Sequence, residues 1–216
     1  MTGYAELHAL SNFSVLRGAS HPAELIYQAH ALGYRALALT DECSLAGVVR
    51  AHEALRELQG TADTADTTGA AGAAGTAGTH PPFKLIIGAE FRAACGLQLV
   101  LLAPSQRAYA QICQLITLGR RRSRKGEYRL ARADFEAGLD QCLALWIAPP
   151  EATPAQAQWL REFFPGRGWL AVQLHRADDD AARLRRALAL GAAAGLPAVA
   201  AGDVHMHVRS RKALQD

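Results

Sequence analysis

The sequence has few of the features that would mark a specialised class of protein. None of its four cysteines, Cys43, Cys95, Cys113 and Cys142, stands in a CxxC pair. This excludes a zinc knuckle or a thiol redox motif of that kind. Scattered cysteines are typical of a reducing compartment, and the sequence therefore predicts a cytoplasmic protein with reduced thiols.

Long apolar runs are also lacking. No run is long enough to span a bilayer, and residues 1–9 carry Glu6 where a signal peptide would have an uninterrupted apolar region. The sequence therefore predicts neither a membrane segment nor a membrane partner.

The excess of positive charge is small as well: 23 lysines and arginines against 20 acids give a net charge of +3. That value neither requires nor excludes a nucleic-acid partner.

What the chain does contain is apolar sequence in short blocks. With 216 residues, of which 50% are hydrophobic, we expect residues 1–216 to form a single large domain. The blocks alternate with helix-like segments, a rhythm that predicts an α/β fold with a parallel sheet or barrel. The expected strands are residues 4–7, 36–39, 83–89, 97–103, 142–147, 169–174 and 198–201, and the expected helices are residues 22–32, 47–58, 105–118, 153–164 and 178–194.

Side chains that bind metals or transfer protons follow several of these strands. His8 follows the first strand, Asp41 and Glu42 the second, Glu90 the third, and the segment 203–205 (Asp-Val-His) the last. Residues just past the C-terminal ends of strands gather at one mouth of an α/β sheet or barrel. The sequence therefore predicts one polar cluster at that mouth.

Residues 60–80 interrupt this order. They consist almost entirely of Gly, Ala, Thr and Asp and show no apolar periodicity. Such a segment buries too little apolar surface to offset the entropy lost on ordering. We expect a flexible surface insertion.

One basic run follows the expected helix 105–118, and it consists of Arg120, Arg121, Arg122, Arg124 and Lys125. Such a run can contact DNA phosphates and release their counterions. No aromatic residue is interleaved with it to stack on bases. The alternatives to DNA contact are a solvated loop and a docking surface for another domain.

The strand-end segments together resemble the PHP (polymerase and histidinol phosphatase) domain. They are most similar to the N-terminal domain of bacterial C-family DNA polymerases, the polymerase III α-subunit type. The resemblance rests on residues 7–14 (LHALSNFS), 38–47 (ALTDECSLAG), 87–90 (IGAE) and 202–207 (GDVHMH). Residues 118–122 (LGRRR) are most similar to the error-prone, damage-induced branch. The resemblance implies a distorted seven-stranded (β/α) barrel of the PHP type, at the N-terminus of a longer polymerase.

The resemblance also implies where a metal site would lie. Active PHP domains hold divalent metals, usually zinc, manganese or iron, on His, Asp, Glu and Cys side chains, and the metals activate a water that attacks a phosphoester. Carried over position by position, the site falls on His8, Leu10, Arg17, Glu42, Glu90, Gln98, Asp203 and His205. Leu10, Arg17 and Gln98 stand where the family has ligands.

Arg17 bears most directly on whether such a site survives. A guanidinium is always protonated and never a ligand, and a charge of +1 about 4 Å from a +2 ion repels it by roughly 8 kcal/mol at an effective dielectric near 20. We therefore hypothesise that Arg17 sits among Glu42, Glu90 and Asp203 and holds the strand ends together in place of metals. No metal or other cofactor is then expected in this domain.

A residual metal site is the alternative. It would draw zinc or manganese ligands from a set that adds two histidines to the matching positions: His8, Glu90, His175, Asp203, His205 and His207. His207 lies one alternation beyond His205, so the two would face the same side of an extended segment.

Two functions follow from these observations. In the first, the chain is a catalytically inactive structural and partner-docking module of an error-prone DNA polymerase that acts in damage-induced mutagenesis and translesion synthesis. The resemblance then implies several partners: the remaining polymerase domains with their Mg²⁺, DNA through those domains, a sliding clamp and a Y-family-like mutagenesis protein. In the second, the chain is a metal-dependent phosphoesterase or a 3′–5′ proofreading exonuclease.

Overall fold

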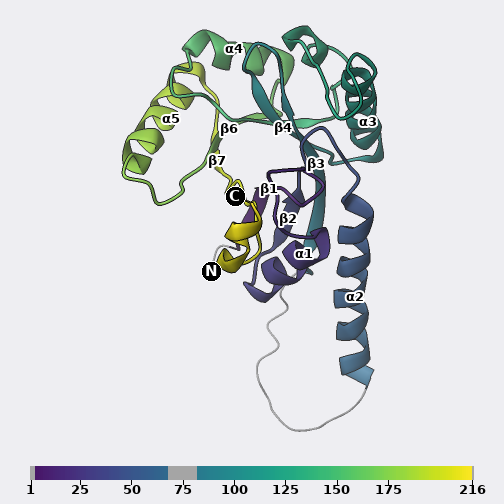
Figure 1. Cartoon of the computed structure of the whole chain (residues 1–216). Coiled ribbons are helices and arrows are strands. Elements are labelled where there is room, and N and C mark those ends of the chain that lie inside the picture. The colour runs from purple at the N-terminus through teal and green to yellow at the C-terminus, as the bar shows by residue number, and fades with distance from the viewer. Residues whose placement is uncertain (1–2, 68–81, 216) are drawn as a thin grey trace.

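The computed structural model describes residues 3–67 and 82–215 (Figure 1). Its strands are β1 (Ala5–Ala9), β2 (Ala36–Leu39), β3 (Lys84–Arg92), β4 (Gln98–Leu102), β5 (Leu143–Trp146), β6 (Gly168–Val172) and β7 (Ala198–Ala200). Its helices are α1 (Pro22–Ala31), α2 (Val48–Thr67), α3 (Gln106–Arg121), α4 (Pro154–Phe163) and α5 (Asp180–Ala194), with short 3₁₀ helices at Arg132–Phe135 and Arg209–Leu214. The predicted order of strands and helices is confirmed, including the direct connection from β3 to β4.

The strands follow one another across the sheet in chain order from β1 to β7. Neighbouring strands are parallel except at β4, which runs antiparallel to both β3 and β5. The prediction of a parallel sheet is wrong for β4, because residues 93–97 turn directly from β3 into β4 and leave no room for a crossover helix. As a result, Gln98 at the start of β4 lies opposite Arg92 at the end of β3.

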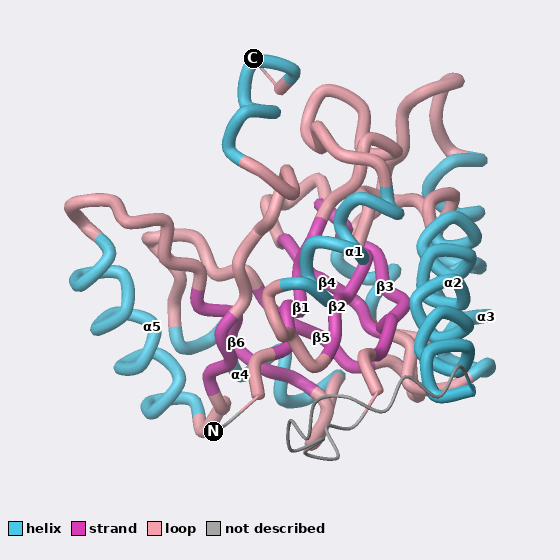
Figure 2. The backbone as a smooth tube through the Cα atoms, turned by 90° about the horizontal axis from the view of Figure 1, so that it is seen from below, coloured by secondary structure: helices cyan, strands magenta, loops and turns pink. Residues whose placement is uncertain are grey.

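The sheet curls into a nearly closed barrel (Figure 2). Its two edges meet where Ala9 forms an isolated parallel bridge with Val204, whose amide donates to the carbonyl of His8 over 2.9 Å. At the same seam the buried carboxylate of Glu6 accepts hydrogen bonds from the amides of His8 (2.8 Å) and Gly202 (2.7 Å). The distorted seven-stranded barrel implied by the family resemblance is confirmed.

Apolar side chains fill both sides of the sheet. A small inner cluster draws on several strands and consists of Ala38, Val100, Leu102, Leu145, Ala171 and Ala201. Outside, α1 and α2 pack on β2 through one cluster, and α3 and α4 cover β3–β6 through a larger one. Because side chains alternate along a strand, this division decides which residues reach the interior. In β3, Ala89 and Phe91 belong to the outer cluster, so Glu90 between them points inward.

A β-bulge brings His8 to the same interior. Glu6 lies opposite Leu37 and Ala9 opposite Leu39, so β1 advances by three residues where β2 advances by two. His8 was expected to follow the first strand, but it lies within β1. The extra residue lets His8 turn toward Glu90 although its neighbour Leu7 also packs on the inner cluster.

The helix α2 runs further than its sequence indicates. It was expected to end at residue 58, and it continues to Thr67. Residues 60–67, which were expected to belong to a flexible surface insertion, therefore form the end of this helix, and residues 68–80 lie outside the described part of the chain. Once a helix has formed, each further residue adds one hydrogen bond while only one more residue has to be ordered, so a helix can extend past its apolar stripe. None of the described helices combines the length and apolarity needed to cross a membrane.

Candidate functional site at the barrel mouth

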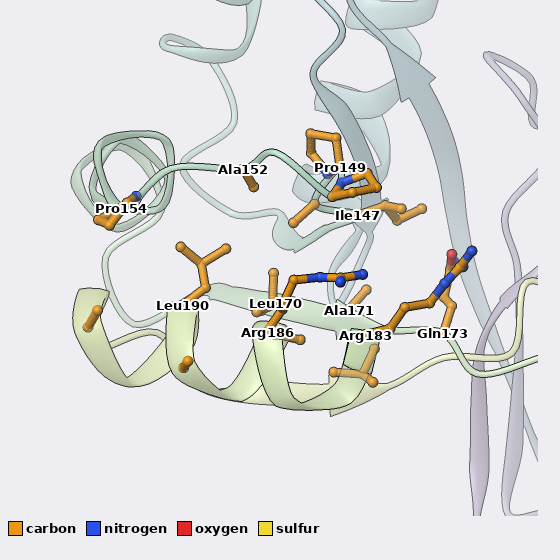
Figure 3. Close-up of a pocket in the computed structure, with 16 residues that line it drawn as sticks. Ile147, Pro149, Ala152, Pro154, Leu170, Ala171, Gln173, Arg183, Arg186 and Leu190 are labelled. Carbon is orange, nitrogen blue, oxygen red and sulfur yellow. The ribbon is translucent and has the colours of Figure 1, made fainter. Parts of the chain in front are cut away.

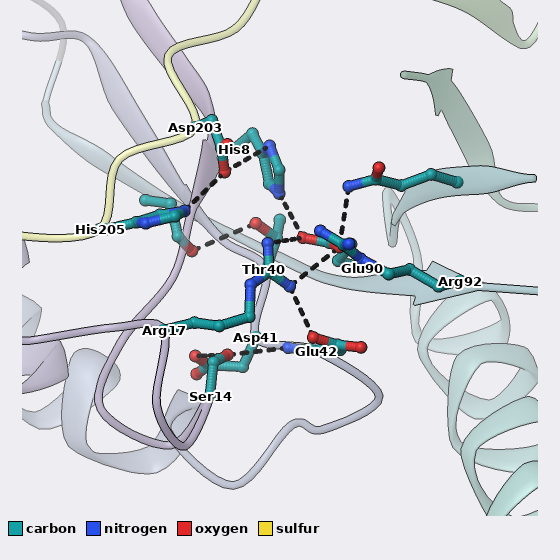
Figure 4. Close-up of polar contacts among 12 residues, drawn as sticks. His8, Ser14, Arg17, Thr40, Asp41, Glu42, Glu90, Arg92, Asp203 and His205 are labelled. Carbon is teal, nitrogen blue, oxygen red and sulfur yellow. Dashed lines mark hydrogen bonds and ion pairs between the residues drawn. The ribbon is translucent and has the colours of Figure 1, made fainter. Parts of the chain in front are cut away.

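The carboxylate of Glu90 is the centre of the polar cluster at the barrel mouth (Figure 4). The side chain is fully buried. Its Oε1 accepts hydrogen bonds from Arg17 Nη1 (2.9 Å), Arg92 Nε (2.8 Å) and Gln98 Nε2 (2.9 Å). Its Oε2 contacts Arg17 Nη2 and His8 Nε2, each at 3.0 Å. Both oxygens are thus engaged by side chains of this chain.

Arg17 forms a two-pronged contact with Glu90 and a second ion pair with Glu42, whose Oε2 lies 2.6 Å from Nη1. Tyr128 donates to the other oxygen of Glu42 over 2.8 Å. Burial alone would lower the pKa of Arg17, but hydrogen bonds and charge from Glu90 and Glu42 raise it above its ordinary value. The guanidinium is therefore a fixed positive charge, and its planar fork matches the carboxylate geometry of Glu90.

The same contacts set the protonation of Glu90. Burial would raise the pKa of this carboxyl, but hydrogen bonds from His8 and Arg17 hold it well below the ordinary range for glutamate. Glu90 therefore stays ionised at neutral pH and is a poor proton donor or acceptor. Its chemistry is that of a structural counter-ion.

The loop after β1 places Arg17, and Asp41 holds this loop. The buried carboxylate of Asp41 accepts hydrogen bonds from the amide and hydroxyl of Ser11 and from the hydroxyl of Ser14, each over 2.7 Å. Burial raises the pKa of Asp41, and these serine hydrogen bonds oppose the rise. Gly18 closes the loop because a Cβ at that position would lie 2.0 Å from the carbonyl oxygen of Ser11. Asp41 thus supports the cluster without belonging to it.

His8 connects Glu90 to the C-terminal segment. Its Nε2 contacts Glu90, and its Nδ1 lies 2.9 Å from Gln173 Nε2 and 3.5 Å from Asp203 Oδ1. Asp203 in turn contacts His205 Nε2 at 3.0 Å. Burial would raise the pKa of Asp203, but the hydrogen bond from His205 and the imidazole of His8 lower it. The cluster therefore ties β1 and β3 to the segment after β7.

The structure places the predicted residues in three groups. One network of hydrogen bonds and ion pairs joins the first group: His8, Arg17, Glu42, Glu90, Gln98, Asp203 and His205. Leu10 is fully buried beside it and supplies no ligand atom. His175 is exposed outside the mouth, and His207 bonds to Ser20 over 2.7 Å.

The expected neighbours of Arg17 are partly corrected. Glu42 and Glu90 lie where the hypothesis put them, but among the described residues Arg17 makes no ion pair with Asp203. Asp203 has a positive φ of 49°, and the chain turns it toward His8 instead. In place of one cation bound by three acids, the mouth has a guanidinium at one end and an imidazole bridging two acids at the other.

Three residues of the network escaped sequence reasoning. Gln173 follows Ala171 by one strand alternation, and Ala171 faces the inner cluster, so strand periodicity could have identified it. Arg92 follows Glu90 in the same way. Tyr128 comes from the irregular segment between α3 and β5, and no local pattern indicates its contact with Glu42.

The basic run is divided between internal and exposed roles. Arg120 donates to the carbonyls of Gly126 and Cys43, and Arg122 pairs with Asp134 at 2.7 Å. The other three basic side chains, Arg121, Arg124 and Lys125, are exposed. Only these three therefore present charge that internal contacts do not use.

Three side chains of the cluster have the spacing of a metal site, but their surroundings do not suit a metal. His8, Glu90 and Asp203 each offer a donor atom within 4.8 Å of the others, which is the spacing of a three-ligand metal group. However, the guanidinium of Arg17 lies at 2.9 and 3.0 Å from both oxygens of Glu90 and would repel a cation bound there. His8 also has a contact at each ring nitrogen. The spacing allows a metal, but the charge and the occupied donors do not fit one.

Comparison with known proteins agrees with the fold and the motifs. The family model for the PHP domain matches residues 6–172, and the chain belongs to the PHP domain family. It is 54% identical over 99% of its length to an error-prone DNA polymerase of Azoarcus sp. (strain BH72) and 54% identical over its whole length to one of Pseudomonas paraeruginosa. It covers only 21% and 19% of those relatives, so the chain spans about a fifth of their length.

Solved structures share the fold at low sequence identity. One is a protein of Bifidobacterium adolescentis assigned as a metal-dependent phosphoesterase, with a TM-score of 0.60, 14% identity, and coverage of 95% of this chain and 88% of that one. Another is an amidohydrolase of Chromobacterium violaceum, solved with sulfate and no metal, with a TM-score of 0.60, 16% identity, and coverage of 94% and 88%.

Proposed function

We propose that this chain is the PHP domain of an error-prone DNA polymerase, in which a guanidinium has replaced the metal centre and the domain serves as a structural module. The two-pronged contact of Arg17 with the buried Glu90 carries this proposal. The pair occupies the carboxylate that a metal would need, and Glu42 and His8 add a further contact to Arg17 and to Glu90 respectively.

The mouth is poorly suited to phosphoester hydrolysis. That reaction needs a metal-activated water and a base that can take its proton. Glu90 is held ionised by five contacts, and its depressed pKa makes it a weak base. The ionised carboxylate is instead suited to fixing the strand ends, because it joins β1, β3, β4 and the loop that carries Arg17.

The wider role follows from the relatives. Two relatives at 54% identity are error-prone DNA polymerases about five times as long as this chain. The proposal therefore includes polymerase domains in cis that use Mg²⁺, contact with DNA through them, and service in translesion synthesis and damage-induced mutagenesis in the cytoplasm. A sliding clamp and a Y-family-like mutagenesis protein are the proposed partners. The exposed Arg121, Arg124 and Lys125 are the proposed phosphate contacts within this chain.

A second function is favoured by one observation. The donor atoms of His8, Glu90 and Asp203 lie within 4.8 Å of one another, which suits a residual zinc or manganese site and a phosphoesterase or proofreading exonuclease. For this function the guanidinium of Arg17 would have to leave Glu90.

The two functions differ in a simple assay. The purified chain is incubated with a primer that carries a 3′ mismatch, in the presence of Mn²⁺ or Zn²⁺, and the shortened products are resolved on a gel. The structural module leaves the primer intact, and His8→Ala changes nothing. Metal-dependent shortening that His8→Ala abolishes would establish the exonuclease and overturn the structural proposal.

A further inference from the structure

An apolar groove adjoins the barrel mouth (Figure 3). It lies between β6, the connection from β5 to α4, and α5, and has a volume of about 590 Å³. Its walls are apolar and rich in proline, with Pro149, Pro150, Pro154, Ala152, Leu170 and Leu190 among the lining residues. Gln173 also lines the groove, and its amide contacts His8, so this side chain belongs to both the groove and the mouth.

The helix α5 covers only part of the surface beside the groove. Of this helix only Gly191 and Ala194 are buried, both in its last turns. A helix of a globular domain normally buries an apolar stripe along its whole length. In the described part of the chain, α5 instead leaves apolar side chains exposed along the groove, including Ala189 and Ala193.

Two arginines on α5 give the groove its charge. Arg183 and Arg186 line it, and Figure 3 shows their guanidinium groups extending over its floor. No acidic residue is among the lining side chains. Within the described residues Arg186 makes no ion pair, and Arg183 pairs only with Asp179 (2.7 Å), at a site where both side chains are about half exposed. Such exposed pairs contribute little and exchange partners readily.

We propose that this groove is the docking site for a peptide segment of a partner protein, with apolar side chains flanked by acidic residues. The apolar floor takes the aliphatic or aromatic anchors, and the two guanidinium groups take the carboxylates. The three wall prolines have no N–H to donate, so side chains rather than strand pairing provide recognition along that wall. This role is separate from the proposed structural function of the mouth.

Nucleic acid is the less suitable occupant. Single-stranded binding sites stack bases on aromatic side chains, and the groove has none in its lining. A carboxylate and a phosphate would both meet the arginines, but only a peptide also uses the alanine, leucine and proline floor.

The test uses a displayed library of random twelve-residue peptides. The library is selected on the intact chain alone, and an Arg183→Glu/Arg186→Glu double variant is kept for the binding measurements. Enriched peptides are then synthesised with a fluorescein label and measured by fluorescence anisotropy. We expect them to contain Asp or Glu beside Leu, Ile or Phe, and to bind the double variant at least about tenfold more weakly, as expected for two lost ion pairs.

A neighbouring arginine provides the matched control. Arg185 lies on the same helix, is exposed, and does not line the groove, so Arg185→Glu should leave peptide binding unchanged. Circular dichroism melting of all variants verifies that they are folded, and Arg183→Gln/Arg186→Gln repeats the test without reversing charge.

Several results would overturn the proposal. These are selection without acidic enrichment, equal binding to the double variant, and tight binding of a labelled oligothymidylate in preference to the peptides. A concentration-dependent dimer that the double variant loses would identify a second copy of the chain as the occupant instead.

Discussion

The barrel mouth and the apolar groove beside α5 share Gln173, but their arginines differ in burial and in pairing. At the mouth, the guanidinium of Arg17 is mostly buried and faces two carboxylates. In the groove, Arg186 is exposed and forms no ion pair with any described residue. A buried charge must be paired within the chain, because leaving it uncompensated is costly, whereas an exposed one is free to meet a partner. The contrast supports both proposals: that the mouth stabilises the domain and that the groove binds a partner peptide.

Among the variants that test this comparison, those that remove Arg17 should lower the stability of the domain most. Arg17→Ala leaves the buried Glu90 without its main counter-charge and should lower the free energy of unfolding by about 3–5 kcal/mol. Urea unfolding at pH 7 measures it. Arg17→Lys keeps the charge but not the planar fork and should recover only part of the loss. An unchanged unfolding midpoint for Arg17→Ala would show that the pair does not hold the mouth.

The pH dependence of stability should be the next largest effect. Since the pKa of Glu90 is lower in the folded chain than in the unfolded one, its contribution is complete above about pH 5 and is lost as the pH falls through 4 toward the folded value. A shift of this direction contributes about 2 kcal/mol or more. The free energy of unfolding, measured from urea curves between pH 7 and pH 3, should therefore fall more steeply with decreasing pH for the native chain than for Glu90→Gln. Parallel pH profiles for the two would contradict the depressed pKa.

Loss of the side chain that joins the two regions should have an intermediate effect. Gln173→Ala removes the contact at the Nδ1 of His8, which is fully buried, and should cost about 1 kcal/mol. Gln173→Glu keeps the size but puts an acceptor in place of the amide donor, beside the carboxylate of Asp203, so it should not restore the stability. Thermal melting of both variants provides the measurement. If Gln173→Glu is as stable as the native chain, the role of Gln173 is packing rather than hydrogen bonding.

Removal of exposed arginines should change the stability of the domain least. Arg92→Ala removes a contact to Glu90 from a side chain that is 51% exposed, and should cost no more than about 1 kcal/mol. Arg186→Ala in the groove should change stability by less than about 0.5 kcal/mol. A loss for Arg186→Ala as large as that for Arg17→Ala would erase the distinction between the two regions.

Local sequence predicted much of the fold, because apolar blocks and polar strand ends are short-range signals. The same alternation that hides Phe91 in the outer core turns Glu90 inward. The antiparallel direction of β4 was not predicted, because the connection from β3 is too short to hold the crossover helix that parallel strands need. The extension of α2 was missed because its residues lack an apolar stripe.

Side-chain partners across long distances were harder to predict. That Arg17 would face acids followed from its place in the motif, but no local pattern indicates that Asp203 has a positive φ and contacts His8 instead of Arg17. Tyr128 reaches Glu42 from a segment without regular structure. Such contacts depend on how loops cross in space rather than on their own composition.

The metal content of the purified chain tests the central claim most directly. After dialysis against a weak chelator and then metal-free buffer, inductively coupled plasma mass spectrometry would count zinc, manganese and iron per chain. If the guanidinium of Arg17 has taken the place of the metals, the count stays far below one for each of them. Two or more tightly held ions per chain would contradict that account and favour an active hydrolase.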